Sequence, residues 1–179
     1  MTPKTGLTPG SFAPDFTLND FYRKPWRLRD ALRKGPVLIV FFRGGWCPYC
    51  SAYLRRVQAE LATPVAELGG SICAISSDSP GIPADEVDKK ALSFPVLSDP
   101  EGKVLDQFNA ANHLSPTEYA AEKQWHDIEA YSRNKLHIIA VPGVTVLDQD
   151  GKVIFNELNL DLQKRPEPAA VLRVLKAVV

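Results

Sequence analysis

The most informative part of this chain is Val37-Leu38-Ile39-Val40-Phe41-Phe42, followed closely by Trp46-Cys47-Pro48-Tyr49-Cys50. Its first part is rich in β-branched and aromatic residues, which predicts a strand over residues 36–42 that is buried on both faces. Arg43-Gly44-Gly45 forms a loop. A helical pattern then begins at Cys47, because apolar side chains recur with helical spacing at Tyr53, Leu54, Val57 and Leu61.

Two cysteines stand at the start of this predicted helix. With Cys47 at the N-cap, Pro48 takes the first helical position, where a missing N–H costs nothing. Cys50 follows one turn later on the same face, at roughly 5–6 Å between Cβ atoms, so a modest local adjustment closes a disulfide. The first-turn N–H groups and the helix dipole favour a thiolate at Cys47, and Arg43 adds positive charge nearby.

Two other readings of the cysteine pair are an inert buried pair and half of a structural zinc site. Zinc normally takes four ligands. The remaining candidates are Cys73, within a predicted strand, and three histidines without ligand spacing, His113, His126 and His137. We therefore expect no metal or organic cofactor. Cys73 is expected to be an inert core thiol, and His126 to be solvated.

Composition narrows the class of protein. The 179 residues predict one domain over residues 1–179, and the 21 basic and 21 acidic side chains balance. No basic stripe argues for nucleic acid, and no apolar run approaches the roughly 18 residues of a membrane span. The first residues lack an apolar signal region. With three cysteines, one of them isolated, a disulfide framework is not expected, and we expect a reducing, cytoplasmic compartment.

Strand and helix patterns alternate along the chain. We expect a hairpin over 15–28, a short helix over 28–33, strands at 71–76 and 94–97, and helical stretches at 83–92 and 104–108. Pro64 is expected to break or kink the long helix, with a short continuation at 65–68. A helix over 116–133 begins with the capping box Ser115-Pro116-Thr117-Glu118.

The last third of the chain completes the pattern. Residues 136–141 are apolar and extended, residues 144–155 form a hairpin with an Asp-Gly turn, and residues 171–179 form a closing helix. This order predicts an α/β fold, with a central mixed sheet flanked by helices on both faces.

The order of elements, with its cysteines, resembles the thioredoxin superfamily, and within it the peroxiredoxin-like subgroup of the alkyl hydroperoxide reductase/thiol-specific antioxidant branch. The resemblance covers nearly the whole chain, including an N-terminal β-hairpin extension and an inserted helix. It rests on these segments in order: Gly10-Ser11-Phe12-Ala13-Pro14-Asp15-Phe16-Thr17-Leu18, Ser76-Ser77-Asp78-Ser79-Pro80, Phe94-Pro95-Val96-Leu97-Ser98-Asp99-Pro100, and Val141-Pro142 before Val144-Thr145-Val146-Leu147-Asp148.

The resemblance also implies roles for individual residues. Trp46-Cys47 is similar to the Trp-Cys of thioredoxins, and Cys47-Pro48-Tyr49-Cys50 matches the tetrad typical of glutaredoxins. By this resemblance Cys47 is the attacking thiolate and Cys50 resolves the mixed disulfide. Pro142 would be cis, and the backbone of Val141 would bind an extended substrate.

Other side chains are expected around the same site. Trp46 shapes access to it, and Tyr49 is partly exposed. Pro48 and Tyr49, the two middle residues, bias the redox potential. Together with Arg43, these residues form the expected substrate-binding surface.

The chain departs from both family patterns. Thioredoxins carry a buried aspartate where this chain has Phe41. Peroxiredoxins carry Pro-x-x-x-Thr-x-x-Cys. With Cys50 at the peroxidatic position, Cys47 replaces the threonine, Arg43 replaces the proline, and Pro142 replaces a distant arginine. The groups that polarise a peroxide are therefore missing as a set, and such groups commonly contribute several kcal/mol.

Three functions follow from these patterns. The first is a thiol–disulfide oxidoreductase that cycles Cys47 and Cys50 between dithiol and disulfide. The second is a thiol peroxidase with Cys50 peroxidatic and Cys47 resolving. The third is a redox-switched binding or structural module without enzymatic activity, in which the helix at 116–133 either covers the site or forms an interface.

The first two functions imply an antioxidant role in cell redox homeostasis. The substrate would be a disulfide or a peroxide, and thioredoxin or glutathione would be the electron donor. The sequence leaves the oligomeric state open, a homodimer included.

Overall fold

A mixed sheet organises the protein. The computed structural model describes residues 6–82 and 87–179. Within these residues seven strands pair in the order β2 (Pro25–Arg27), β1 (Thr17–Asp20), β5 (Val96–Ser98), β4 (Ser71–Ser76), β3 (Val37–Phe41), β8 (Gly143–Leu147) and β9 (Val153–Leu158). The three central strands β3, β4 and β5 are parallel, whereas β1, β8 and β9 run antiparallel to their neighbours. The predicted central mixed sheet is confirmed.

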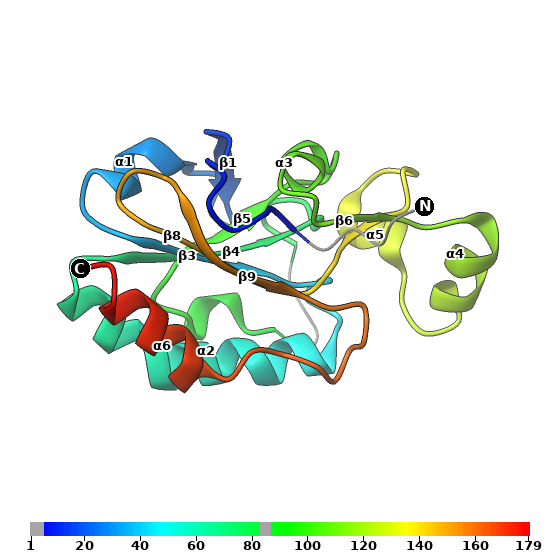
Figure 1. Ribbon diagram of the computed structural model, residues 1–179. Helices are drawn as coiled ribbons and strands as arrows, with labels where there is room; N and C mark the ends of the chain where they lie inside the picture. Colours follow the sequence, from blue (N-terminus) through cyan, green and yellow to red (C-terminus); the bar gives the residue numbers. More distant parts are fainter. Residues whose placement is uncertain (1–5, 83–86) are drawn as a thin grey trace.

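Helices cover both faces of this sheet. The helices α2 (Pro48–Glu67) and α6 (Pro168–Lys176) lie on one face, and α1 (Leu28–Leu32) and α3 (Lys103–Gln107) on the other (Figure 1). Successive side chains of a strand point to opposite faces. Leu38 and Val40 of β3 therefore join the apolar cluster under α2, while Ile39 and Phe41 join the cluster on the α1 side. All five residues of β3 are at most 1% exposed, as their apolar run predicts.

The long helix differs from its prediction at Pro64. The helix α2 begins at Pro48 and continues through Pro64 to Glu67. A proline removes one backbone hydrogen bond and crowds the preceding turn. Packing compensates for that cost, because Val57, Leu61 and Val65 of α2 are almost completely buried in the core. The predicted break is therefore wrong.

The segment inserted before β8 is more divided than expected. Instead of one helix over 116–133, it contains α4 (Pro116–Lys123) and α5 (Ile128–Ser132). The capping box at Ser115 and Glu118 is present, as predicted, and Asp127 starts a new helix by accepting a hydrogen bond from the N–H of Ala130. Beside them, β6 (Ala111–His113) and β7 (Ile138–Ala140) form a separate antiparallel pair. The strand β6 was not predicted, since its short sequence carries no β-branched residue.

Part of the helical stretch predicted at 83–92 lies outside the described residues, namely 83–86. The described remainder contains only the short 3₁₀ helix η1 (Lys89–Ala91). Its first turn is closed by Asp88, whose side chain accepts a hydrogen bond from the N–H of Lys90.

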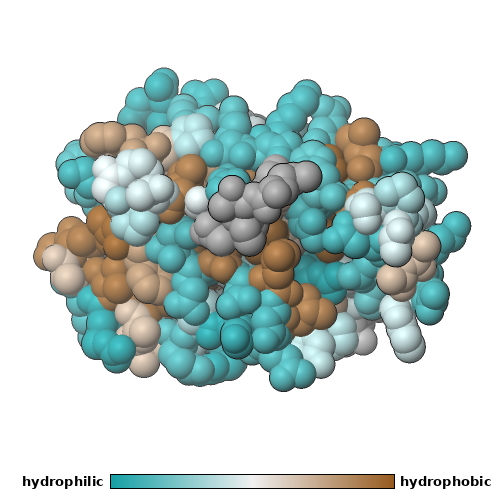
Figure 2. Space-filling view, turned by 45° about the vertical axis from the view of Figure 1, so that its right-hand side comes forward, coloured by the Kyte–Doolittle hydropathy of each residue, from teal (hydrophilic) through white to brown (hydrophobic). Residues whose placement is uncertain are grey.

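The surface carries no obvious single apolar face in the view of Figure 2. That view is mainly hydrophilic, and its hydrophobic side chains gather in separate patches. Trp125, between α4 and α5, is 78% exposed. Among the residues that the structure describes, no helix has both the length and the hydropathy for crossing a bilayer.

Candidate active site

The two cysteines lie where the central strand passes into the longest helix. Cys47 is the N-cap of α2 and Pro48 its first residue, as predicted. The N–H of Cys47 donates to the carbonyl of Gly44 at 3.1 Å, and the N–H of Ser51 donates to the carbonyl of Cys47 at 3.0 Å. Both cysteines are free thiols, and each is only 1% exposed. The strand, the loop and the helix start therefore hold a dithiol just beneath the surface.

The environment of Cys47 favours its thiolate. A hydrogen bond from the Cys50 thiol is the main cause that lowers the pKa of Cys47, from 9.0 to about 6. The N–H of Cys50 and the Arg43 guanidinium act in the same direction, while burial opposes them. An anion at a helix N-terminus is also stabilised by the orphan N–H groups there. Reduced Cys47 is therefore ionised near neutral pH.

Cys50 behaves in the opposite way. Its thiol donates to Cys47, and together with burial and repulsion from the Cys47 anion this raises the pKa of Cys50 well above its ordinary value. Two groups counteract the rise. The N–H of Arg43 donates to Cys50 Sγ at 3.4 Å, and the Nη2 atom of Arg165 lies 3.8 Å from the same sulfur. The pair thus consists of one thiolate, at Cys47, and one protonated thiol, at Cys50.

Arg43 and Trp46 connect the dithiol loop to the inserted segment. Arg43 is 6% exposed and forms an ion pair with Glu122 of α4. Its guanidinium carbon also lies 4.9 Å from the centre of the Trp46 ring, and the ring of His126 stacks on Trp46 with centroids 4.2 Å apart. The prediction that His126 is solvated is therefore wrong, because the insertion folds back onto the loop.

A buried ion pair between Asp78 and Lys89 holds the dithiol loop in place. The N–H of Gly45 donates to Asp78 Oδ2 at 2.8 Å, and Lys89 Nζ lies 3.3 Å from the same oxygen. Asp78 and Lys89 are 2% and 7% exposed. Desolvation raises the pKa of the Asp78 carboxyl, and the positive charge of Lys89 partly offsets this rise. Asp78 belongs to one of the segments that carry the family resemblance, but no sequence pattern predicted its contact with Gly45.

Val141 and Pro142 lie at the same edge of the sheet as the dithiol loop, because Gly143 pairs with Phe41. The predicted cis Pro142 is wrong, whereas the role of the Val141 backbone in substrate binding stays a prediction. The Val141–Pro142 bond is trans. The N–H of Val141 already donates to the carbonyl of Ala110 at 2.7 Å, and the Val141 side chain packs in the cluster on the α1 side. That N–H is therefore occupied and not free for a substrate.

The other predicted side chains differ in their exposure. Trp46 is 5% exposed and Tyr49 47% exposed, and Pro48 is also exposed, so Pro48 and Tyr49 form the outer edge of the site. Cys73 lies on β4 with no exposed surface, and burial alone raises its pKa strongly. This fits an inert core thiol. No cluster of side chains suited to hold a metal ion occurs within residues 6–82 and 87–179.

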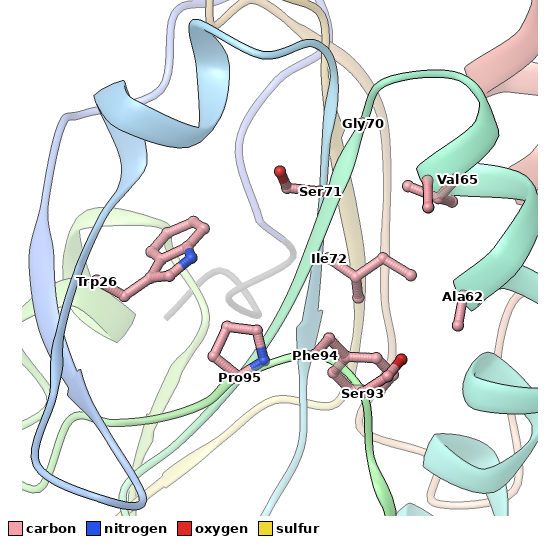
Figure 3. Close-up of a pocket in the computed structure, with 10 residues that line it drawn as sticks. Trp26, Ala62, Val65, Gly70, Ser71, Ile72, Ser93, Phe94 and Pro95 are labelled. Atoms are coloured by element: carbon pink, nitrogen blue, oxygen red, sulfur yellow. The ribbon is translucent and has the colours of Figure 1, made fainter.

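A separate pocket of about 240 Å³ lies at the amino end of β4 (Figure 3). Trp26 borders it on one side of β4, and Ala62 and Val65 of α2 border it on the other. It surrounds Gly70 and Ser71 at the amino end of β4, whereas the dithiol follows the carboxyl end of the parallel strand β3. This pocket takes no part in the chemistry of the dithiol.

A helix-capping dithiol on a central mixed sheet defines the class of the protein as a thiol-dependent oxidoreductase with a thioredoxin-like fold. The AhpC/TSA family matches residues 9–156, and the chain belongs to this family.

Two relatives carry names from different branches of thiol chemistry. A Mycobacterium tuberculosis protein, named provisionally as a peroxiredoxin, is 29% identical over 164 residues, which cover 89% of this chain and 90% of that protein. The thiol-disulfide oxidoreductase ResA of Geobacillus kaustophilus is 30% identical over 124 residues, covering 69% of this chain and 68% of ResA. Thiol redox chemistry is common to both names.

Solved structures confirm the fold. The crystal structure of peroxidoxin BcpB from Mycobacterium tuberculosis superposes with a TM-score of 0.69 at 24% identity, over 97% of this chain and 99% of that chain. A cysteine-to-serine mutant of the peroxiredoxin 6 of Arenicola marina gives a TM-score of 0.70 at 15% identity, over 96% of this chain and 73% of that chain.

Proposed function

We propose that the protein is a thiol–disulfide oxidoreductase in which Cys47 attacks and Cys50 resolves. The observation that carries this proposal is the asymmetry of the pair, since the pKa of Cys47 is lowered to about 6 and that of Cys50 is raised. The Cys47 thiolate attacks a substrate disulfide and releases one thiolate. Cys50 then loses its proton and attacks Cys47 Sγ, which expels the second thiolate and leaves the Cys47–Cys50 disulfide.

Access to Cys47 requires movement, because its side chain is almost completely buried. The part of the surroundings best suited to move is α4 with the turn that follows it, since α5 is held in the core by the buried Ile128. No residue of α4 is buried, and polar and ring contacts join this part to the dithiol loop through the Arg43–Glu122 ion pair and the stack of His126 on Trp46. Elements with few buried apolar contacts open at low cost in free energy. A disulfide substrate would enter where Glu122 and His126 withdraw.

The electron donor in this proposal is a small thiol or a dithiol protein, with glutathione and thioredoxin as the two candidates. Either would reduce the Cys47–Cys50 disulfide by the reverse sequence of exchanges. The half-exposed ring of Tyr49 and the exposed Pro48 would form the outer contact surface for that donor.

A second candidate function is a thiol peroxidase with Cys50 as the peroxidatic residue. The observation that favours it is the pair of N–H donors at Cys50 Sγ, from the Arg43 backbone and from Arg165. Donors of this kind stabilise a thiolate and the developing charge on a peroxide oxygen. Cys50 would form a sulfenic acid with release of water or an alcohol, and Cys47 would condense with it to the disulfide and a second water.

The two functions are separated by single-cysteine variants. Reduced Cys47→Ser and Cys50→Ser proteins are mixed with hydrogen peroxide in a stopped-flow instrument, and the modified residue is identified by mass spectrometry. Disulfide exchange predicts that, per thiolate, both react with peroxide no faster than an ordinary cysteine thiolate, and that Cys50→Ser traps a disulfide substrate on Cys47. Rapid sulfenic acid formation in Cys47→Ser would instead assign the peroxidase function. Cys73 serves as the internal control, since it has no exposed surface.

A further inference from the structure

Arg165 is far from Cys50 in sequence and was not singled out by any motif. It lies in the connection between β9 and α6, yet its Nη2 atom is 3.8 Å from Cys50 Sγ. Arg165 is partly buried, and its charge lowers the pKa of Cys50 against the effect of burial. Among the charged side chains of the described residues, it is the cation recorded in contact with this sulfur.

The position of Arg165 is held by its surroundings. Its Nη1 atom donates to the carbonyl of Lys164 at 2.9 Å and more weakly to that of Asp161 at 3.4 Å. The next residue, Pro166, accepts a hydrogen bond at 2.8 Å from the hydroxyl of Tyr53, which is buried one turn beyond Cys50 on α2. The guanidinium is therefore held by carbonyls of its own loop, and this loop is held to the helix that carries Cys50.

The second step of the exchange needs such a group. Cys50 must lose its proton within a buried environment before it attacks Cys47, and buried thiols resist ionisation. The buried aspartate of thioredoxins is replaced by Phe41 in this chain. The titratable side chains that act on Cys50 are the Cys47 thiol and the Arg165 guanidinium, and the backbone N–H of Arg43 donates to its sulfur. When Cys47 is bound in a mixed disulfide, its negative charge is gone and Arg165 remains.

We propose that Arg165 is a catalytic residue that stabilises the Cys50 thiolate during resolution of the mixed disulfide. The inference rests on the proposed exchange function and adds a residue to it. In this step the Cys50 proton passes to solvent, the Cys50–Cys47 bond forms, and the bond between Cys47 and the substrate sulfur breaks, with the electron pair leaving on the substrate thiolate. The guanidinium donates to Cys50 Sγ before the attack and takes no proton itself.

The test uses an aromatic disulfide, dithiobis(nitrobenzoate), because each exchange releases one coloured thiolate. Attack by Cys47 gives the first release, and resolution by Cys50 gives the second. Arg165→Gln is expected to leave the first phase unchanged and to slow the second about tenfold, the lower range for one charge-assisted hydrogen bond. In Arg165→Lys, which keeps the charge, the rate of the second phase should lie between those of the wild-type protein and Arg165→Gln. Lys164→Gln is the matched control, since it removes a charge from the same loop at a side chain that is 68% exposed.

A second measurement separates catalysis from a merely structural role. In a Cys47→Ser background, the absorbance of the thiolate reports the titration of Cys50, because burial keeps Cys73 protonated. Arg165→Gln should shift this titration to higher pH and Lys164→Gln should not. Circular dichroism verifies that each variant is folded. If Arg165→Gln does not fold, the same two measurements are made on Arg165→Lys.

The outcomes for the proposed function and for Arg165 are distinguishable. If the wild-type protein releases both thiolates and folded Arg165→Gln matches it in the second phase and in the titration, the role of Arg165 is overturned while the exchange function stands. If the wild-type protein never forms a mixed disulfide at Cys47, the exchange function fails and the inference fails with it.

Discussion

The ionisation of Cys47 is the property on which the proposed chemistry depends, and alkylation tests it directly. The thiolate is the reactive form. Because the pKa of Cys47 is lowered from 9.0 to about 6, about nine tenths of it is ionised at pH 7, against about one hundredth for an ordinary thiol. The structure therefore predicts a gain in thiolate of about ninety-fold at that pH.

The perturbation is Cys50→Ala, which removes the main cause of the low pKa. The hydrogen bond from the Cys50 thiol stabilises the Cys47 anion more than any other group. Without it, the fraction of Cys47 thiolate at pH 7 should fall, so alkylation should need a higher pH. Burial continues to oppose ionisation, while the Arg43 charge still favours it.

The assay follows the rate of alkylation by iodoacetamide against pH, with mass spectrometry to assign the modified residue. The midpoint of the profile is the quantity to compare, because the 1% exposure of Cys47 lowers every absolute rate. Wild-type protein should show a midpoint near the Cys47 pKa of about 6 and Cys50→Ala a higher one. Cys73 should stay unmodified until the protein is unfolded. A wild-type midpoint near that of a free cysteine, or one that Cys50→Ala does not move, would contradict a low Cys47 pKa caused by the Cys50 hydrogen bond.

Three further predictions follow from contacts around the loop. Lys89→Met leaves the Asp78 carboxylate buried without its cation, and the free energy of unfolding in urea should fall by about 3–5 kcal/mol at neutral pH. This loss of stability should shrink in acid, where Asp78 is protonated in both the folded and the unfolded state. As a control, Lys103→Met, which removes an exposed ion pair, should leave the urea midpoint unchanged. Glu122→Gln removes the ion pair with Arg43, so alkylation of Cys47 at high pH should become faster, and an identical rate would contradict the proposed entry route. Ser115→Ala removes the capping hydroxyl that accepts from the Glu118 N–H at 3.2 Å, and should destabilise α4 by about 1 kcal/mol. Hydrogen exchange should then be faster in α4 alone. Slower or unchanged exchange in α4 would count against a cap-dependent helix.

Strongly patterned segments were predictable because local forces and burial agree in them. The apolar run of β3 requires burial on both faces, and Pro48 together with Cys47 specifies a helix start by backbone geometry alone. The capping box at Ser115 and Glu118 likewise depends on residues three apart. Tertiary packing decided two features that were missed: β6 pairs with β7, and α2 continues through Pro64 because its apolar face is buried in the core.

The class of fold follows from the order of strand and helix patterns along the chain, and the place of the dithiol and the advantage of Cys47 as the thiolate follow from neighbours within one helical turn. The surroundings of the two sulfurs depend instead on packing between distant segments. Arg165 reaches Cys50, Asp78 anchors Gly45, and Glu122 and His126 lie against Arg43 and Trp46. These contacts join segments 33 to 115 residues apart, and no local pattern encodes which distant side chains meet when the sheet and its helices pack.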